Sequence, residues 1–173
     1  ASSMADRPDL STEEGRLAAI AWLNERLPTK RVIAQGLLRN ERDEILLCQL
    51  TYKKEWDLPG GVVDPHESPA TCVEREVHEE LGLDVRAGRL IAVNWLPPWR
   101  GWDDAMLFLF DLGRIVSGAI DPSRFLSREI AAAHWCPLAD VGNHVAPYNA
   151  ALLSQVDGLA GTSYLENSAP RGS

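Results

Sequence analysis

The chain has 173 residues, of which 45% are hydrophobic and 24% are charged, with 13 glycines and 11 prolines. These fractions are those of an ordinary globular protein, so they exclude collagen-like, coiled-coil and disordered chains, and the length suits one domain. With 17 Lys and Arg against 25 Asp and Glu, the formal net charge is −8 at pH 7. A negative chain repels phosphate backbones, so we expect no nucleic acid partner.

No apolar run approaches the roughly 18 residues that a membrane-spanning helix needs, and no basic-then-apolar signal segment opens the chain. We therefore expect no membrane association and a cytoplasmic location. The three cysteines, Cys48, Cys72 and Cys136, are widely spaced and lie among apolar neighbours. This pattern indicates reduced thiols that pack as small hydrophobic side chains, and it disfavours a disulfide framework or a zinc site.

The first predicted element is a helix from about residue 12 to residue 27. Ser11 and Glu14 have the spacing of a capping box, in which the hydroxyl accepts a hydrogen bond from a first-turn N–H. Pro28 lacks the N–H that would continue the helix, so the helix should end before it. Apolar residues recur near helical spacing, so we expect this helix to pack, either on its own domain or against a second copy in a homodimer.

Two β-rich runs follow, at about residues 31–38 and 45–50, joined by a polar turn. Residues 51–61 are expected to form a loop. A second helix is predicted over residues 69–81. Ser68 is its expected N-cap, Pro69 occupies a first-turn position that tolerates proline, and Gly82 lies just past its end.

In the second half of the chain, strands are predicted at about 89–95, 106–112 and 132–135, and a last helix at about 146–159. Residues 161–173 are polar and glycine-rich, so we expect a flexible tail. The irregular order of strands and helices favours an α/β fold with a mixed sheet and helices on both faces. The expected organisation is an N-terminal tail and helix at 1–28, one domain at 29–160 and the tail at 161–173.

The most informative segment is the second predicted helix. Glu76, Glu79 and Glu80 stand at i, i+3 and i+4, so their carboxylates project to one side, while Val73 and Val77 belong to a separate apolar stripe. Three like charges within one turn repel one another and do not stabilise a helix. Such a cluster can bind a hard divalent cation, since Mg²⁺ prefers carboxylate oxygens and water as ligands. The alternative is a solvated helix face.

The spacing around these glutamates resembles a known family. Gly61, five residues, Glu67, seven residues, and then the run from Arg75 to Leu83 match the Nudix box at every defined position. The preceding residues 56–61 and the later residues 135–138 also resemble that family. The resemblance implies a Nudix fold, which is an α/β/α sandwich with a mixed β-sheet.

The resemblance also implies an activity. Members of this family use Mg²⁺ or Mn²⁺ to hydrolyse the diphosphate linkage of a nucleoside diphosphate joined to another group X. Expected substrates are small nucleotides such as ADP-ribose-like compounds, nucleotide sugars or nucleoside triphosphates. The alternative is a Nudix module that senses a nucleotide without turning it over, and the sequence does not choose among the substrates.

Residue roles follow from the same resemblance. Glu76, Glu79 and Glu80 correspond to metal ligands, with the backbone carbonyl of Gly60 or Gly61 as a further one.

The resemblance gives the neighbouring box residues supporting roles. Arg75 would orient Glu76, and Glu67 would pair with Arg75 or hold a metal-bound water. The general base stays open between Glu79 and Glu129, with Glu76 as the choice if one metal is used.

Outside the box, a loop rich in tryptophan and proline follows the strand predicted at 89–95. Trp95, Trp99 and Trp102 could form a stacking wall for a base or sugar, and Arg100 could reach a phosphate. The alternative is that these tryptophans pack within the core or the loop. Tyr52, just ahead of the box, is a further candidate for substrate contact.

Overall fold

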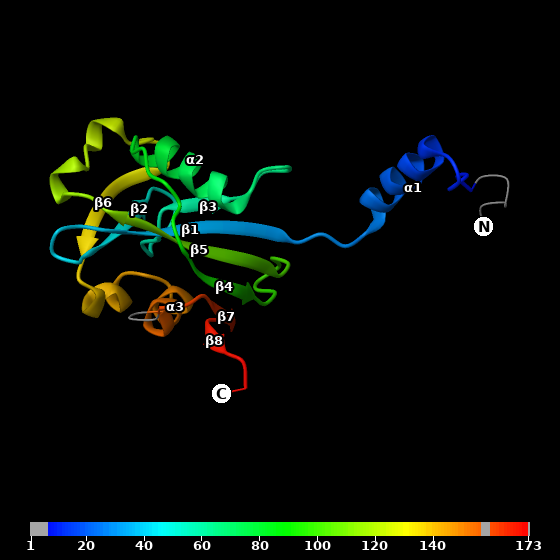
Figure 1. Ribbon diagram of the computed structural model, residues 1–173. Helices are drawn as coiled ribbons and strands as arrows, with labels where there is room; N and C mark the ends of the chain where they lie inside the picture. Colours follow the sequence, from blue (N-terminus) through cyan, green and yellow to red (C-terminus); the bar gives the residue numbers. More distant parts are fainter. Residues whose placement is uncertain (1–6, 157–159, 173) are drawn as a thin grey trace.

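The computed structural model describes residues 7–156 and 160–172. Their central feature is an eight-stranded sheet in the order β6-β2-β1-β5-β4-β7-β8, with β3 paired to β1 (Figure 1). The strands are β1 (Arg31–Arg39), β2 (Ile45–Leu50), β3 (Gly60–Val62), β4 (Leu90–Leu96), β5 (Ala105–Arg114), β6 (Ile130–Cys136), β7 (Ser163–Glu166) and β8 (Ala169–Pro170). The α-helices are α1 (Glu13–Arg26), α2 (Pro69–Leu81) and α3 (Pro147–Val156), and short 3₁₀ helices cover Ser117–Ala119, Pro122–Arg124 and Leu138–Asn143.

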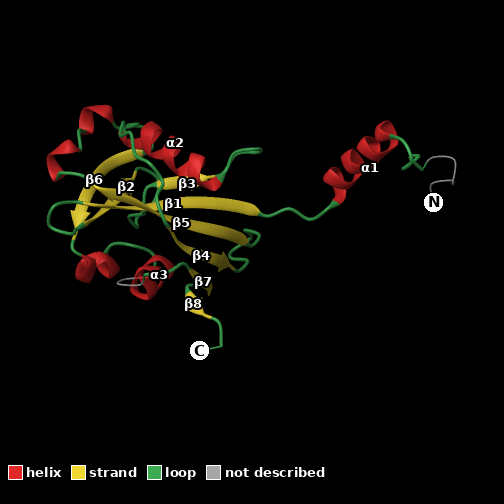
Figure 2. Cartoon of the chain, in the orientation of Figure 1, coloured by secondary structure: helices red, strands yellow, loops and turns green. Residues whose placement is uncertain are grey.

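The sheet is mixed, as predicted. β1 runs parallel to β5 and antiparallel to β2, while β4 runs antiparallel to β5 and parallel to β7. Helices lie on both faces of it, with α2 above and α3 below in the view of Figure 2. The predicted α/β/α sandwich is therefore confirmed.

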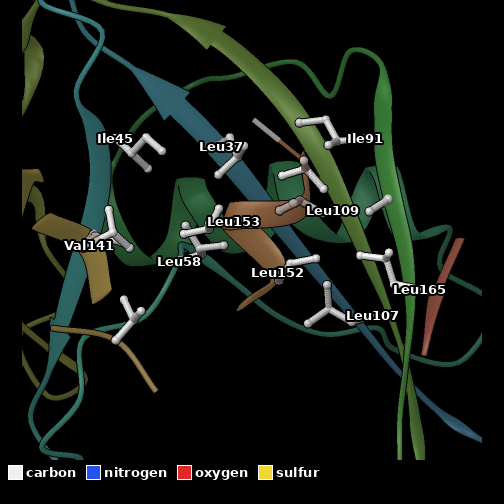
Figure 3. Packing of buried hydrophobic residues seen from close by; sticks show 14 of the residues in the cluster. Leu37, Ile45, Leu58, Ile91, Leu107, Leu109, Val141, Leu152, Leu153 and Leu165 are labelled. Atoms are coloured by element: carbon white, nitrogen blue, oxygen red, sulfur yellow. The ribbon is translucent and has the colours of Figure 1, made fainter. Parts of the chain in front are cut away.

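Each face of the sheet has its own hydrophobic cluster, because consecutive residues of a strand point to opposite sides. The cluster under α3 includes Leu37, Ile45, Leu107, Leu152 and Leu153 (Figure 3). The cluster under α2 includes Leu38, Leu46, Val73, Val77 and Leu81. Cys48, Cys72 and Cys136 are buried and unbridged, as expected.

The caps of α2 form as the sequence predicts. The Ser68 Oγ accepts a hydrogen bond from the Thr71 N–H at 3.1 Å, and Pro69 is the first helical residue. Gly82 ends the helix in the left-handed conformation, with φ of 68°, and its N–H donates to the carbonyl of His78. These caps fix the ends of the helix that carries the acidic cluster.

The N-terminal helix differs from its prediction in two respects. Its N-cap is Thr12, whose hydroxyl accepts from the Gly15 N–H at 3.0 Å, because the Ser11 hydroxyl is bonded to Asp9 instead. The helix also stands away from the sheet (Figure 1) and leaves Leu17 and Ile20 exposed. Of the two expected arrangements, packing of α1 on its own domain is therefore not observed.

The C-terminal segment was also predicted wrongly. Residues 163–166, expected in a flexible tail, form β7 and pair in parallel with β4. Leu165 is 1% exposed and belongs to the cluster under α3, so burial of this side chain holds the strand in the sheet. Residues 157–159 of the last predicted helix lie outside the described residues. No helix in the described part of the chain has both the length and the apolar character needed to cross a membrane.

Candidate active site

The short strand β3 places two glycines against helix α2. Gly60 pairs with Gln35 of β1 and has φ of 143°, and a Cβ there would lie 2.1 Å from the Ala34 carbonyl oxygen. A Cβ on Gly61 would lie 2.6 Å from the side-chain carboxyl carbon of Glu76. Glycine is therefore required at position 60 by both backbone conformation and space, whereas a side chain at position 61 would displace the Glu76 carboxylate.

Glu80 lies against the same strand. Its side chain accepts a hydrogen bond from the Gly60 N–H at 3.1 Å, and the residue is only 6% exposed. Burial raises the pKa of Glu80 to about 8, and repulsion from Glu76 and Glu129 adds to this effect. Burial also raises the pKa of Glu76. The site thus holds acidic groups whose charged forms are poorly stabilised without a cation.

Arg75 organises the remaining acids of the box. Its Nε and Nη2 donate to the two carboxylate oxygens of Glu67 at 2.6 and 2.9 Å. Its Nη1 lies 3.1 Å from oxygens of both Glu76 and Glu79. Hydrogen bonds from Arg75 lower the pKa of Glu67 to about 2, so Glu67 is ionised over the physiological range.

Glu129 reaches the site from another part of the chain. The N–H of Leu126 donates to the Glu80 carbonyl at 3.0 Å, and the Thr51 N–H donates to the Glu129 carbonyl at 2.9 Å. The first bond holds the segment before β6 beside the end of α2, and the second holds it beside the end of β2. The structure therefore brings Glu129 close enough to Glu76 and Glu80 to raise the pKa of both. The spacing of these residues in the sequence does not predict this proximity.

The donor types fit a hard divalent cation, since carboxylates and the carbonyls of Gly60 and Gly61 are oxygen ligands. The buried Glu80 supports this fit, because a bound cation would stabilise its charged form. Among residues 7–156 and 160–172, however, no group of three or more His, Cys, Asp or Glu residues is arranged to hold a metal ion. One reason is that Glu79, with a half-exposed side chain, is turned toward Arg75.

A cavity of about 160 Å³ opens beside the acids. Its walls combine apolar, aromatic and polar residues from β1, β2, β3, the loop before β3, α2 and α3. The lining residues are Ile33, Gln35, Leu50, Tyr52, Asp57, Leu58, Gly60, Gly61, Val62, Glu80 and Tyr148. Tyr52 was a sequence candidate, whereas Tyr148, Gln35 and Asp57 were missed because only the tertiary fold brings them to Glu80.

The tryptophan-rich loop forms a separate hairpin. Trp99 and Trp102 exchange two backbone hydrogen bonds, and Arg100 and Gly101 between them both have positive φ, as a type I′ turn requires. The two rings are 65% and 64% exposed, and the guanidinium of Arg100 lies over Trp99. None of the described residues lining the cavity comes from this hairpin.

Trp95 has a different place from the other loop tryptophans. It lies on β4, and its indole N–H donates to the carboxylate of Asp104 at 2.7 Å. The same carboxylate is paired with Lys30. These contacts fix the base of the hairpin.

An α/β/α sandwich with an acidic helix is the class of fold observed here, and comparison of the sequence with protein-family models identifies the family. The NUDIX domain matches residues 29–155, so the chain belongs to the Nudix family.

Individual relatives match shorter stretches of the chain. Diphosphoinositol polyphosphate phosphohydrolase 2 of Rattus norvegicus is 37% identical over 65 residues, which are 37% of this chain and 36% of that protein. The putative ADP-ribose pyrophosphatase YjhB of Bacillus subtilis is 34% identical over 86 residues, 49% of this chain and 41% of that protein. The chain thus spans less than half the length of these curated relatives.

Solved structures match over more of the chain. The MutT protein from Methanosarcina mazei Go1 has a TM-score of 0.65 and 26% identity, covering 76% of this chain and 95% of its own. An ADP-ribose pyrophosphatase from Streptococcus suis has a TM-score of 0.57 and 26% identity, covering 80% of this chain and 99% of its own.

Proposed function

We propose that this protein is a metal-dependent pyrophosphohydrolase that cleaves the diphosphate linkage of a nucleoside diphosphate joined to another group X. The observation that carries the proposal is the packing of Glu76 and Glu80 against Gly60 and Gly61, with Glu80 buried next to a cavity. Hydrolysis of a diphosphate requires neutralisation of developing negative charge and a positioned water. A site of clustered oxygens beside a cavity can provide both when divalent cations are bound.

Glu76, Glu79 and Glu80 would hold Mg²⁺ or Mn²⁺, together with a carbonyl of Gly60 or Gly61. Bound metal would supply positive charge at the phosphates and lower the pKa of a coordinated water. Glu79 must leave its contact with Arg75 to join the other ligands. The half-exposed position of its side chain gives it room to turn.

The supporting residues have separate roles in this proposal. Arg75 orients Glu76, and Glu67 holds Arg75 through two short hydrogen bonds. Glu79 and Glu129 are the two candidates for the general base. Glu129 is favoured if Glu79 is occupied as a ligand, because backbone bonds hold its segment beside Glu80.

We further assign the Trp99–Trp102 hairpin, with Arg100, to contact with the part of the substrate outside the cavity. Two exposed indole rings offer flat apolar surfaces that a base or sugar can cover. Trp95 supports this surface through its bond to Asp104.

The activity is tested with purified protein and a panel of ADP-ribose, nucleotide sugars, dinucleoside polyphosphates and nucleoside triphosphates. We expect release of phosphorylated products in Mg²⁺ or Mn²⁺, loss of turnover in excess EDTA, and recovery when metal is restored. Full activity in EDTA would contradict the metal-dependent mechanism. Tight binding of a nucleotide with no turnover under any metal would point to the sensing module instead.

A further inference from the structure

Helix α1 exposes a continuous apolar face. Leu17, Ile20 and Leu23 lie on one side of the helix at 100° per residue, and each is at least 40% exposed. Gly15 is the only buried residue of α1, and the backbone of Asp9, just before the helix, fills the space beside it. The rest of the helix stands away from the sheet (Figure 1). A cluster of exposed apolar side chains of this kind marks a surface that packs against a partner.

A groove elsewhere in the molecule complements this face. It lies between α3 and the 3₁₀ helix Leu138–Asn143 and has a volume of about 550 Å³. None of its described lining residues is charged, and four of them are small, namely Ala139, Gly142, Ala150 and Ser154. Small residues leave room for large side chains from a helix laid along the groove, as in other complexes of an amphipathic helix with an apolar groove.

The surface around this groove is poor in charge. Residues 138–156 include one acidic residue, Asp140, and no Lys or Arg, whereas 24% of the whole chain is charged. Ala139, Ala151 and Ser154 are exposed in this segment, at positions where a surface helix usually carries polar or charged side chains. Depletion of charged residues distinguishes the centre of a protein interface from the rest of a protein surface. The groove therefore has the composition of an interface.

The linker after α1 determines which copy of the helix can fill the groove. Residues 27–30 span at most about 14 Å, so the last turn of α1 stays near Arg31 at the start of β1. The groove begins near the other end of this strand, because Arg39 pairs with Ile45, and Ile45 pairs with Cys136, two residues before the groove. At about 3.3 Å per residue, β1 rises by about 26 Å between its ends. The α1 of the same chain therefore cannot lay its whole face in the groove, whereas the α1 of a second copy can.

The area of the contact favours a reciprocal exchange over a single docked helix. α1 has 14 residues and is about 21 Å long, so a 120° face of a helix about 12 Å wide covers about 250 Å². One docked helix then buries about 500 Å² on the two surfaces, which is less than the roughly 1,000 Å² of a stable interface. Two helices exchanged between two copies reach that value.

We propose that two copies of the chain exchange their N-terminal helices, so that Leu17, Ile20 and Leu23 of each copy fill the groove between α3 and the 3₁₀ helix Leu138–Asn143 of the other. This contact lies outside the candidate active site, since no described residue that lines the groove also lines the cavity beside Glu80. The inference does not depend on the proposed function.

Disulfide trapping tests the contact between the helix and the groove. Ile20→Cys combined with Ala150→Cys places one thiol on the apolar face and one in the groove, and the three native cysteines are buried. After mild oxidation, we expect most of this double variant to run as a covalent dimer on a non-reducing gel. The matched control is Trp22→Cys combined with Ala150→Cys, which should stay monomeric because Trp22 projects to the opposite side of α1. Ile20→Cys alone should also stay monomeric.

A charge placed in the groove tests the same contact without oxidation. Ser154→Arg introduces a cation at an exposed position of the groove, so the fold should survive. We expect the dissociation constant of the dimer, measured by analytical ultracentrifugation, to rise at least about tenfold, because docking of α1 would bury the unpaired charge. Ala151→Arg is the matched control, since Ala151 is exposed on the same helix but does not line the groove. Its dissociation constant should stay within about twofold of the parent value.

Four results would overturn the proposal. A covalent dimer from Ile20→Cys alone would show that the two helices pack on one another. An internal cross-link at the mass of a monomer would show that α1 docks on its own domain. An equal response to Ser154→Arg and Ala151→Arg would show that the groove is not part of the interface. A parent protein that is monomeric at every concentration would show that no exchange takes place.

Discussion

Glu80 is the residue where burial and charge oppose one another most directly. It is 6% exposed, and its carboxylate accepts a hydrogen bond from the Gly60 N–H. We expect Glu80→Gln, which keeps the shape and removes the charge, to lower kcat by at least about 10²-fold, because a proposed metal ligand is lost. The fold should survive, since repulsion among the acids is reduced.

The matched control for this variant is Glu74→Gln on the same helix. Glu74 accepts from the Ala87 N–H at 2.8 Å, and glutamine can keep that bond. Steady-state kinetics of both variants measure the change in kcat, and circular dichroism spectra check that both variants are folded. A near-normal rate for Glu80→Gln would show that the acidic cluster is a structural feature without a role in turnover.

The same burial makes a prediction about stability and pH. The pKa of Glu80 is raised to about 8 in the folded protein, whereas glutamate in an unfolded chain titrates near 4.3. The folded state binds this proton more tightly, so the contribution to stability is fully present below about pH 4 and is lost as the pH rises through about 8. In excess EDTA, Tm should therefore fall more steeply over this range in the parent than in Glu80→Gln.

The difference between the two melting curves isolates Glu80, because all other groups are shared. One group changes stability by at most about 1.4 kcal/mol for each pH unit. Parallel curves for the two proteins would contradict the burial argument. Added Mg²⁺ should flatten the slope of the parent, since metal favours the ionised form.

At the scale of elements, the contact between β3 and α2 depends on Gly61. A Cβ there would lie 2.6 Å from the carboxyl carbon of Glu76, so Gly61→Ala should displace this carboxylate. Because misplacement of a catalytic group by about 1 Å can cost up to 10²-fold, we expect kcat to fall by roughly tenfold or more. Gly118→Ala is the control, as no atom lies within 4 Å of a Cβ at that position. Equal kcat values for the two variants would show that the contact between Gly61 and Glu76 has no effect on turnover.

The tryptophan hairpin makes a different prediction. Trp99 and Trp102 are about two-thirds exposed, so neither contributes much to the core. Changing either to alanine should leave Tm within a few degrees and raise KM by roughly tenfold at little cost in kcat, because stacking on an aromatic ring is worth about 1–3 kcal/mol. Unchanged KM for every substrate in both variants would remove the hairpin from the binding surface.

Local signals explain which elements the sequence could predict. In α2, the N-cap, the first-turn proline, the apolar stripe and the terminal glycine all agree, and the observed bounds match the predicted range of 69–81. β7 was missed because its pairing partner, β4, lies about 70 residues earlier in the chain. A four-residue strand has no periodicity strong enough to identify it alone.

The candidate site also has a part that the sequence predicts and a part that it does not. The acids of α2 follow from helical spacing, and the resemblance supplies their expected roles. The cavity does not follow, because Gln35, Asp57 and Tyr148 come from three distant segments. Their shared wall exists only once the sheet and α3 have packed.

At the scale of the whole molecule, α1 is the element without a visible packing partner in the described structure. Leu17, Ile20 and Leu23 fall within a 120° arc at 100° per residue, and all three are exposed. A 14-residue helix is marginal in water without tertiary contacts. We therefore propose that this face is covered by a second copy of the chain in a homodimer.

Light scattering tests this proposal on the full chain and on a chain without residues 1–28. We expect a dimer for the first and a monomer for the second, with kcat retained because residues 1–28 contain no residue of the candidate active site. Leu17→Ser combined with Leu23→Ser should also give a monomer. Trp22→Ser is the matched control, since Trp22 is exposed but projects to the opposite side of the helix. A monomeric full-length protein would contradict the proposal, as would a double variant that stays dimeric.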